Sequence, residues 1–305
     1  MGHKLVSVII PTYGSNTEPC RAIDSVLAQD YPNVEVVVVD DNGKATNQQM
    51  ENEEVFSKYS EEARFKYIVH EVNKGGSAAR NTGVSHSKGD YLCFLDDDDY
   101  LSDASKIRVQ VDKAETLDEK WAGTYSSCDI YRGEDFVRHL ESSQSGNLLI
   151  PYMEGKLRLE TAAPVIRRGA YERIGGFDET FKRHQDWEFF SRIMDNFMLM
   201  ACPEVTYRRC YKTDVKRKSN SVYLEYMDKY TSSMREQLKS LPKKQLDKLL
   251  KRKYIQIVKS MLHCKEFKDA IHVMKDKHFG LSEWLIMGKG IVDYLIMRKK
   301  YGTHF

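Results

Sequence analysis

Short aliphatic runs that alternate with helix-like stretches are the feature of this sequence that most restricts its fold. Val6–Ile10 and Val36–Val39 are almost continuously apolar, which is typical of strands that are covered on both faces of a sheet. A helix-like stretch, about Glu18–Gln29, lies between them. Strand, helix and strand in repeated succession predict a parallel sheet with right-handed crossovers.

The first two hundred residues continue this alternation. The predicted strands are Leu5–Pro11, Glu35–Asp40, Phe65–His70, Tyr91–Leu95, Gly123–Ile130, Ala162–Arg167 and Met200–Tyr207, and the predicted helices are Glu18–Gln29, Thr46–Glu62 and Ser77–His86. We therefore expect an α/β fold with a mostly parallel central sheet flanked by helices. Ligands of such sheets bind beyond the carboxyl ends of the strands, so the polar residues after each strand are the candidates for function.

Charge is divided unevenly along the chain, although the 305 residues together carry a net charge of only +2. Residues 207–305 contain 24 Lys and Arg against 10 Asp and Glu, whereas residues 1–206 contain 23 against 35. The basic part also reads as helical throughout, with predicted helices at Tyr223–Leu238, Lys243–Leu262, Glu266–Met274 and Leu281–Arg298. We place a domain boundary near residue 215, between a region 1–214 and a basic helical region 215–305.

Composition excludes several classes of protein. An apolar fraction of 41% supports a folded core, and the longest aliphatic run is far too short to span a bilayer. The start of the chain, Met1–Lys4, lacks the apolar block of a signal peptide, so we expect a cytoplasmic protein. The six cysteines show no CxxC pair, and we expect neither a zinc site nor a disulfide framework.

The first two strands both end in residues that suit a flat heterocycle. Pro11-Thr12-Tyr13 follows the first strand and Asp40-Asp41 ends the second. A tyrosine ring can stack on a base, and a carboxylate can accept its ring N–H hydrogen bond. The same residues also suit a plain turn or a helix cap, so both interpretations stay open at this point.

Glycines and small residues precede Arg80 in the segment Asn73–Asn81, at the start of a predicted helix. Helix N-termini and guanidinium groups both attract anions, which favours a phosphate group nearby. The segment is neither a Walker loop nor a GxGxxG fingerprint, and an ordinary glycine turn is the alternative.

Four consecutive aspartates, Asp96–Asp99, follow the predicted strand Tyr91–Leu95. If the backbone stays extended, Asp96 and Asp98 point to one face and Asp97 to the other, so two carboxylates can converge on one hard cation. A hydrated acidic loop or an adventitious calcium site is the alternative.

The last candidate is Asp186 in the segment His184-Gln185-Asp186-Trp187. The spacing of the apolar residues after it predicts that Asp186 lies near the start of a helix. It is either a general base that faces the cleft or an N-terminal acid that the helix dipole stabilises.

Taken together, these motifs resemble those of the family 2 inverting glycosyltransferases with the GT-A fold, of the non-processive bacterial type. The segments that carry the resemblance are VSVIIPTYG, VEVVVVDDNG, NKGGSAARNTGV, GDYLCFLDDDD, GGFDE and HQDWEFFSR, in this order over residues 5–192. The resemblance implies a Rossmann-like GT-A domain, 1–214, that binds a nucleotide sugar.

The resemblance also assigns roles to individual residues. It implies that Asp98 and Asp96 hold Mn²⁺ or Mg²⁺ and that Asp96 and Asp97 also serve the nucleotide as part of a DxD element. It likewise implies that Asp186 is the catalytic base. The residues that it implies for the nucleotide, besides these aspartates, are Pro11, Thr12, Tyr13, Asp41 and Arg80.

Two positions depart from the family pattern. Gln185 stands where the family usually has Glu before the base, and Asn42-Gly43 stands where it usually has Gly-Ser. No QxxRW motif follows the base. The resemblance therefore favours transfer of a single sugar, of the hexosyltransferase type, over processive synthesis.

We accordingly expect a metal-dependent, inverting transfer of one sugar from a UDP-sugar to a hydroxyl of a glycan or lipid-linked glycan, in surface polysaccharide biosynthesis. A sugar nucleotidylyltransferase is one alternative, although the first strand is not followed by the Gly-rich signature expected of that class. A non-catalytic module that binds nucleic acid or membrane through the basic tail is the other, and it leaves the aspartates without a role.

The basic tail allows two interpretations. The apolar stripe of Leu281–Arg298 suits peripheral contact with anionic lipid on the inner face of the cytoplasmic membrane. It equally suits packing in a core or in a homodimer. The loop that we expect after the last strand, Arg208–Lys212, is a candidate lid over the diphosphate. We expect no nucleic-acid partner.

Overall fold

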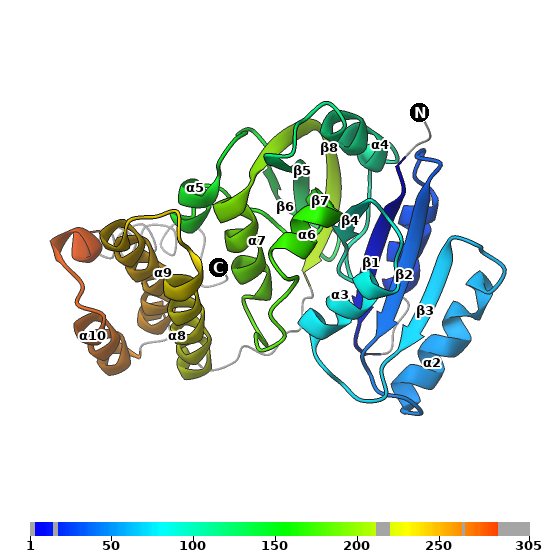
Figure 1. Ribbon diagram of the computed structural model, residues 1–305. Helices are drawn as coiled ribbons and strands as arrows, with labels where there is room; N and C mark the ends of the chain where they lie inside the picture. The colour runs from blue at the N-terminus through cyan, green and yellow to red at the C-terminus, as the bar shows by residue number, and fades with distance from the viewer. Residues whose placement is uncertain (1–3, 15–17, 212–219, 264–265, 286–305) are drawn as a thin grey trace. The chain divides into compact units, whose positions relative to one another are not determined.

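The computed structural model describes residues 4–14, 18–211, 220–263 and 266–285. The chain divides into two compact units, one of residues 1–152 and 157–215 and one of residues 153–156 and 216–305 (Figure 1). Whether the regions 1–214 and 215–305 fold independently, as domains do, stays a prediction.

Four adjacent strands of the first unit form the parallel half of an eight-stranded sheet. They lie in the order β3 (Phe65–Val69), β2 (Val34–Asp40), β1 (Val6–Thr12) and β4 (Tyr91–Phe94). Every residue of β2 and all but one of β1 are buried, as their aliphatic composition predicts. The carboxyl ends of these strands therefore meet at one edge.

The helices that follow these strands begin and end close to the predicted positions. They are α1 (Glu18–Leu27), α2 (Asn47–Phe56) with a 3₁₀ turn η1 (Ser57–Tyr59), and α3 (Gly76–Ser85). Helix α3 packs so closely on β1 that a Cβ added at Gly83 would clash with Cγ2 of Ile9. Glycine at this position lets the helix that carries Arg80 lie directly on the sheet.

The second half of the sheet is mixed. It contains β7 (Pro164–Arg167), β5 (Trp121–Arg132), β6 (Asp135–Leu140) and β8 (Met198–Tyr211). β7 is antiparallel to β4 and to β5, and β6 is antiparallel to β5, whereas β8 runs parallel to β5. The expected mostly parallel α/β sheet is confirmed, and β6 is a strand that the sequence analysis did not predict.

Helix α4 (Lys106–Ala114) was also not predicted. Its Ile107, Val109 and Val111 alternate with polar residues, which is the period of a strand. The helix instead buries Ile107, Gln110, Val111 and Ala114 at helical spacing. The remaining helices of this unit are α5 (Leu149–Met153), α6 (Arg168–Arg173) and α7 (Gln185–Asn196).

The second unit is helical, which confirms the predicted α-helical C-terminal region. Its helices α8 (Asn220–Gln237), α9 (Lys243–His263) and α10 (Phe267–Asp276) match three predicted segments. The fourth predicted helix is Leu281–Arg298. Its first five residues, 281–285, are helical, and the rest lie outside the described residues. Within the described part of the chain, no helix is both long and apolar enough to cross a bilayer.

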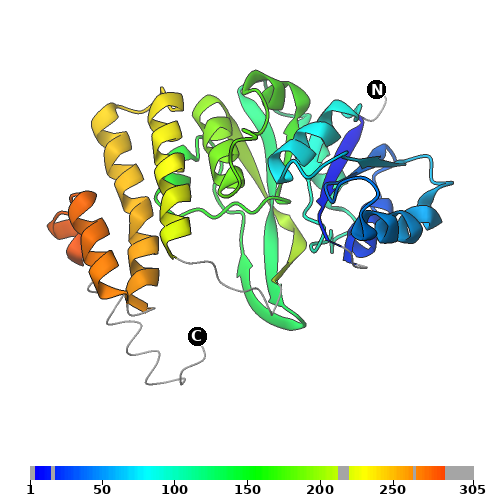
Figure 2. The ribbon, with the colours of Figure 1, turned by 90° about the horizontal axis from the view of Figure 1, so that it is seen from below.

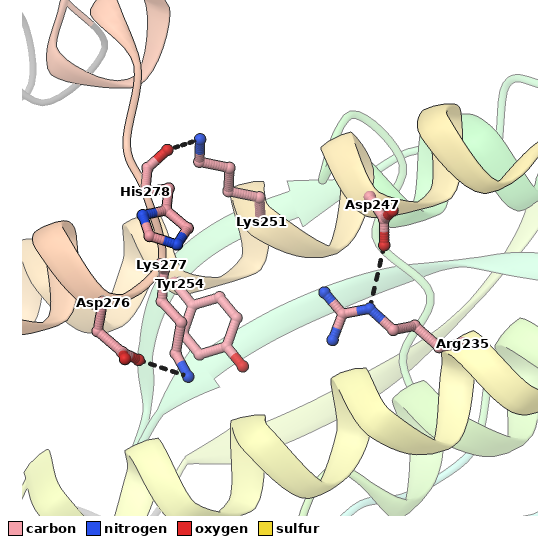
Figure 3. Close-up of a pocket in the computed structure, with 7 residues that line it drawn as sticks. All are labelled: Arg235, Asp247, Lys251, Tyr254, Asp276, Lys277 and His278. Atoms are coloured by element: carbon pink, nitrogen blue, oxygen red, sulfur yellow. Dashed lines mark hydrogen bonds and ion pairs between the residues drawn. The ribbon is translucent and has the colours of Figure 1, made fainter.

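A pocket of about 300 Å³ lies among α8, α9 and the end of α10 (Figure 3). Its charged groups pair with one another: Arg235 Nε donates to Asp247 at 3.0 Å, and Lys277 Nζ lies 3.0 Å from Asp276 and 2.7 Å from Asp228. Tyr254 donates to Asp228. These contacts tie the helices together, and none of the predicted site residues lies here.

Candidate active site

A pocket of about 230 Å³ opens at the carboxyl edge of the parallel strands. The ends of β1 and β2, the start of α3, the aspartate run after β4 and the start of α7 all contribute to it. Its lining residues are Pro11, Thr12, Tyr13, Asp41, Gly76, Ala79, Arg80, Asp96, Asp97, Asp98 and Gln185. All the residues that the sequence predicts for nucleotide and metal thus lie in one cavity.

Tyr13 and Thr12 serve this pocket differently. Tyr13 is 69% exposed, so its ring has a free face for stacking. Thr12 is buried, and its hydroxyl donates to Asp97 Oδ2 at 2.7 Å. The end of β1 thereby fixes one carboxylate of the aspartate run.

Asp41 is buried and already accepts several hydrogen bonds. The backbone N–H groups of Lys74 and Gly75 donate to its two oxygens at 2.7 Å, and His70 Nδ1 lies 2.7 Å from Oδ1. Asp41 therefore holds the loop before α3 in place as well as lining the pocket. A carboxylate oxygen accepts about two hydrogen bonds, so Oδ2 keeps capacity for a ligand donor.

Arg80 is the cation of the pocket. It is buried, and its Nη2 donates to Asp96 Oδ1 at 2.5 Å while Nη1 reaches the carbonyl of Gly76 at 3.3 Å. Its Nε is buried without a hydrogen-bond acceptor among the described residues. The guanidinium therefore lies in the part of the pocket where we expect a phosphate group to bind.

The aspartate run does not continue the strand, which corrects the expectation of alternating faces. β4 ends at Phe94, and the backbone turns so that Asp99 N–H donates to the Asp96 carbonyl at 3.1 Å. The turn brings Asp96, Asp97 and Asp98 together in the pocket. Arg21 holds it from outside by donating to the Asp98 carbonyl at 2.8 Å.

Asp99 has a different place from its neighbours. It is buried and accepts a hydrogen bond from the backbone N–H of Cys210 at 2.8 Å. Burial, together with the nearby charges of Asp96 and Asp98, raises the pKa of this carboxyl well above its ordinary value. Asp99 therefore anchors the aspartate turn to β8 and does not line the pocket.

Asp186 lies in the first turn of α7, next to the pocket wall that Gln185 forms. Burial raises the pKa of its carboxyl above the ordinary value, the negative charge of Asp96 adds to this rise, and Arg80 opposes it. Asp186 is thus electrostatically coupled to both partners of the Arg80–Asp96 pair. Asp186 itself is not among the residues that line the pocket. A carboxyl with a raised pKa beside a cleft is a candidate general base.

The site also contains residues to which the sequence assigns no individual role: Gln185, Gly76 and Ala79 line the pocket, and His70 contacts Asp41. Ser77 on α3 donates to Gln185 Oε1 at 2.9 Å, which joins α3 to α7. Only the fold shows this contact, since the two residues are 108 positions apart. The expected lid is wrong in part: Arg208–Tyr211 belong to β8, paired with β5, and Lys212 lies outside the described residues.

No three His, Cys, Asp or Glu side chains within the described ranges are grouped as a complete metal site. Three carboxylates in one pocket nevertheless suit a hard cation. Mg²⁺ in nucleotide enzymes is commonly bound by one or two carboxylates together with substrate phosphates. The donor set therefore fits a divalent cation whose coordination a diphosphate completes.

Comparison with known families decides the class of this site. The model of "Glycosyl transferase family 2" matches residues 7–175, which include the whole aspartate run and β1 from Ser7 onward. The chain is a family 2 glycosyltransferase. It is therefore an enzyme, and its family excludes both the nucleotidylyltransferase and the non-catalytic module.

The curated relatives of this enzyme are themselves named as glycosyltransferases. The amylovoran biosynthesis glycosyltransferase AmsB of Erwinia amylovora is 27% identical over 71% of this chain and 73% of its own length. An uncharacterized glycosyltransferase of Rickettsia felis is 31% identical over 62% of this chain, but the match spans only 31% of that protein.

Solved structures share the GT-A fold of this enzyme. TarS of S. aureus in complex with UDP-GlcNAc has a TM-score of 0.66 at 20% identity, over 90% of this chain and 80% of that one. The mannosyltransferase PcManGT from Pyrobaculum calidifontis, in complex with GDP-Man and Mn²⁺, has a TM-score of 0.59 at 17% identity, over 96% and 81%. The expected fold class is confirmed.

Proposed function

We propose that this glycosyltransferase moves one sugar from a UDP-sugar to a hydroxyl of a glycan or lipid-linked glycan, with inversion and with a divalent cation, in surface polysaccharide biosynthesis. The observation that carries the proposal is the convergence of Tyr13, Asp41, Arg80 and three aspartates on one pocket. AmsB, named for amylovoran biosynthesis, supports the polysaccharide, and the TarS complex supports UDP-linked donors.

The proposed donor site offers separate residues for the base and for the diphosphate of the nucleotide. The exposed ring of Tyr13 stacks on the base, and Asp41 accepts from it. Arg80 turns from Asp96 to the diphosphate, because a guanidinium binds phosphate oxygens as readily as carboxylate oxygens.

Asp98 and Asp96 would hold Mn²⁺ or Mg²⁺ beside the diphosphate, and Asp97 is fixed by Thr12. PcManGT, solved with Mn²⁺, supports this assignment. The cation supplies Lewis-acid neutralisation of the leaving group when bound. The chain's own residues place the donor against it.

Asp186 would accept the proton of the acceptor hydroxyl as this attacks the anomeric carbon. Attack comes from the face opposite the departing diphosphate, so a single displacement inverts the configuration. The raised pKa of Asp186 suits a base that must take a proton and later release it.

A screen for UDP release tests the proposal. Common UDP-sugars are offered to the wild type with Mn²⁺, and again with a chelator, together with a panel of acceptor glycans. We expect turnover with at least one UDP-sugar and its loss with chelator. Turnover only with another nucleotide sugar, or turnover that the chelator leaves unchanged, would refute the UDP or the metal part.

A further inference from the structure

Two arginines lie on the strands that neighbour β5, each directly opposite the same β5 residue. Ile130 on β5 is the partner of Arg138 on β6 and of Arg209 on β8. Residues directly opposite each other on neighbouring strands point to the same face of a sheet. Arg138 and Arg209 therefore project from one face, one on each side of the buried Ile130. Figure 2 shows the β5–β6 hairpin extending from the sheet that bears them.

A third arginine joins them through a shared carboxylate. Arg209 forms an ion pair with the buried Glu160, and Arg158 Nε lies 3.9 Å from the same carboxylate. Partial burial lowers the pKa of Arg158, whose side chain is 49% exposed, and the positive charges of Arg138 and Arg209 lower it further. Arg158 thus lies close enough to Arg138 and Arg209 for their charges to act on it.

The charges of this cluster do not balance. A guanidinium stays protonated in a protein, and within the described residues Glu160 is the one carboxylate in ion-pair contact with this cluster. The Nε of Arg138 is buried and has no hydrogen-bond acceptor within the described residues. A buried donor without a partner calls for an explanation, and like charges held together favour an anion between them. The guanidinium fork matches phosphate oxygens in particular.

The cluster adjoins the proposed catalytic edge but is separate from the donor pocket, which none of the three arginines lines. Arg209 precedes Cys210, whose N–H donates to Asp99. Burial lowers the pKa of Arg209, but Tyr211 and then the negative charges of Asp99 and Asp96 raise it above the ordinary value on balance. A group bound by the cluster therefore lies beside the aspartate turn.

We propose that Arg138, Arg158 and Arg209 form a binding site for a phosphate group of the acceptor. The inference rests on the proposed function, because it takes the donor to occupy the other pocket. It narrows the acceptor to a phosphate-bearing molecule, either a lipid-linked glycan phosphate or a water-soluble phosphorylated glycan.

Calorimetric titration of inorganic phosphate into the full chain tests the site. UDP and Mg²⁺ are present in excess, so that the donor pocket is filled. We expect the wild type to bind phosphate and the variants Arg138→Gln and Arg158→Gln to bind it about tenfold more weakly or worse. Arg209 is left intact, because its removal would strand the buried Glu160.

Arg108→Gln is the matched control, since Arg108 is an arginine of the same unit that pairs instead with Asp30. This variant is expected to keep the wild-type phosphate affinity. All the variants are expected to keep the wild-type UDP affinity and melting temperature. Equal phosphate binding by every variant, or none by the wild type, would overturn the inference. If the protein did not bind UDP but still bound phosphate in a way that depends on Arg138, the proposed function alone would be overturned.

Two further probes separate the sources of the phosphate. Phosphatidylcholine vesicles with and without a polyprenyl phosphate test the lipid, and glycerol 3-phosphate tests a soluble ester. Arg138-dependent binding of the polyprenyl phosphate vesicles identifies a lipid-linked acceptor. Arg138-dependent binding of glycerol 3-phosphate alone identifies a soluble one. Failure of both probes would contradict the proposal.

Discussion

Asp186, the proposed base, shows how surroundings shift the protonation of one carboxyl. It stands at the start of α7, where backbone N–H groups favour its charged form, yet burial and Asp96 favour its neutral form. The positive charge of Arg80 also favours the charged form and so lowers the pKa. Under the proposed function, this balance leaves a carboxylate that can act as a base and whose pKa responds to charges bound beside it.

Replacing Asp186 by Asn should lower kcat by about 10²- to 10⁴-fold, the usual contribution of a general base. The fold and the UDP affinity should persist, because the amide nearly matches the carboxylate in size. UDP release and UDP titration measure the two effects. Asp195→Asn, at the other end of α7, is the control and should be fully active. Full activity of Asp186→Asn would move the base role to another residue.

The raised pKa of Asp186 has a consequence for pH dependence. The base must be deprotonated to act, so kcat/KM falls as the pH falls through its pKa. Because that pKa lies above the ordinary 3.8, the fall begins at a higher pH than for a solvated aspartate. A pH profile of kcat/KM measures it. The same acid limb in the residual activity of Asp186→Asn would contradict the assignment.

Thr12 tests whether the aspartate turn must be held in shape. Thr12→Val removes the hydroxyl that donates to Asp97, and it should cost about 1 kcal/mol of binding free energy for UDP with metal, which is roughly fivefold. Thr12→Ser keeps the hydroxyl and should behave like the wild type. Calorimetry with UDP and Mn²⁺ compares them. Equal affinity of the Val and Ser variants would show that the hydrogen bond does not matter.

At the scale of elements, the position of α3 on β1 decides where Arg80 lies. A Cβ at Gly83 would approach Ile9 far within van der Waals contact. Gly83→Ala should therefore lower the free energy of unfolding of this unit by about 1–3 kcal/mol, as overpacking does. Urea unfolding measures the change.

Gly169 on α6 provides the control, because an added Cβ there meets nothing within 4 Å. Gly169→Ala should be neutral or stabilise by about 0.5–1 kcal/mol, since alanine loses less backbone entropy in a helix. If both substitutions had the same effect, the close packing of α3 on β1 would not explain the glycine.

The elements also show what the sequence could predict. The parallel half followed from aliphatic runs and helix periods, and parallel strands bring their ends to one edge. Helix α4 and strand β6 were missed because local pattern does not decide them: α4 alternates like a strand, and four of the six residues of β6 are exposed. The position of β7, antiparallel between β4 and β5, depends on pairing with strands that are distant in sequence, which local pattern does not reveal.

The candidate site was predictable to a similar degree. Residues that directly follow strands were placed together correctly in one pocket. The turn at Asp96–Asp99 was not, because it depends on contacts with Thr12, Arg80 and β8 that come from distant parts of the chain. The Ser77–Gln185 contact was hidden for the same reason.

At the scale of the whole molecule, charge separates a sheet-containing unit from a basic helical one. The helical unit exposes the large apolar side chains Phe267, Ile271, Leu281, Trp284 and Leu285. Contact with an anionic membrane and pairing of two chains both stay predictions. Flotation with vesicles that contain anionic lipid, with and without residues 280–305, separates them, because only membrane contact makes flotation depend on these residues.

The central claim concerns the aspartate turn and what it holds. A crystal structure with UDP and Mn²⁺, with the manganese located by anomalous scattering, tests it most directly. We expect a single manganese peak at Asp98, close to Asp96, with the diphosphate against it and the uracil at Tyr13. Manganese absent from this turn, with the nucleotide bound in another part of the protein, would contradict the account.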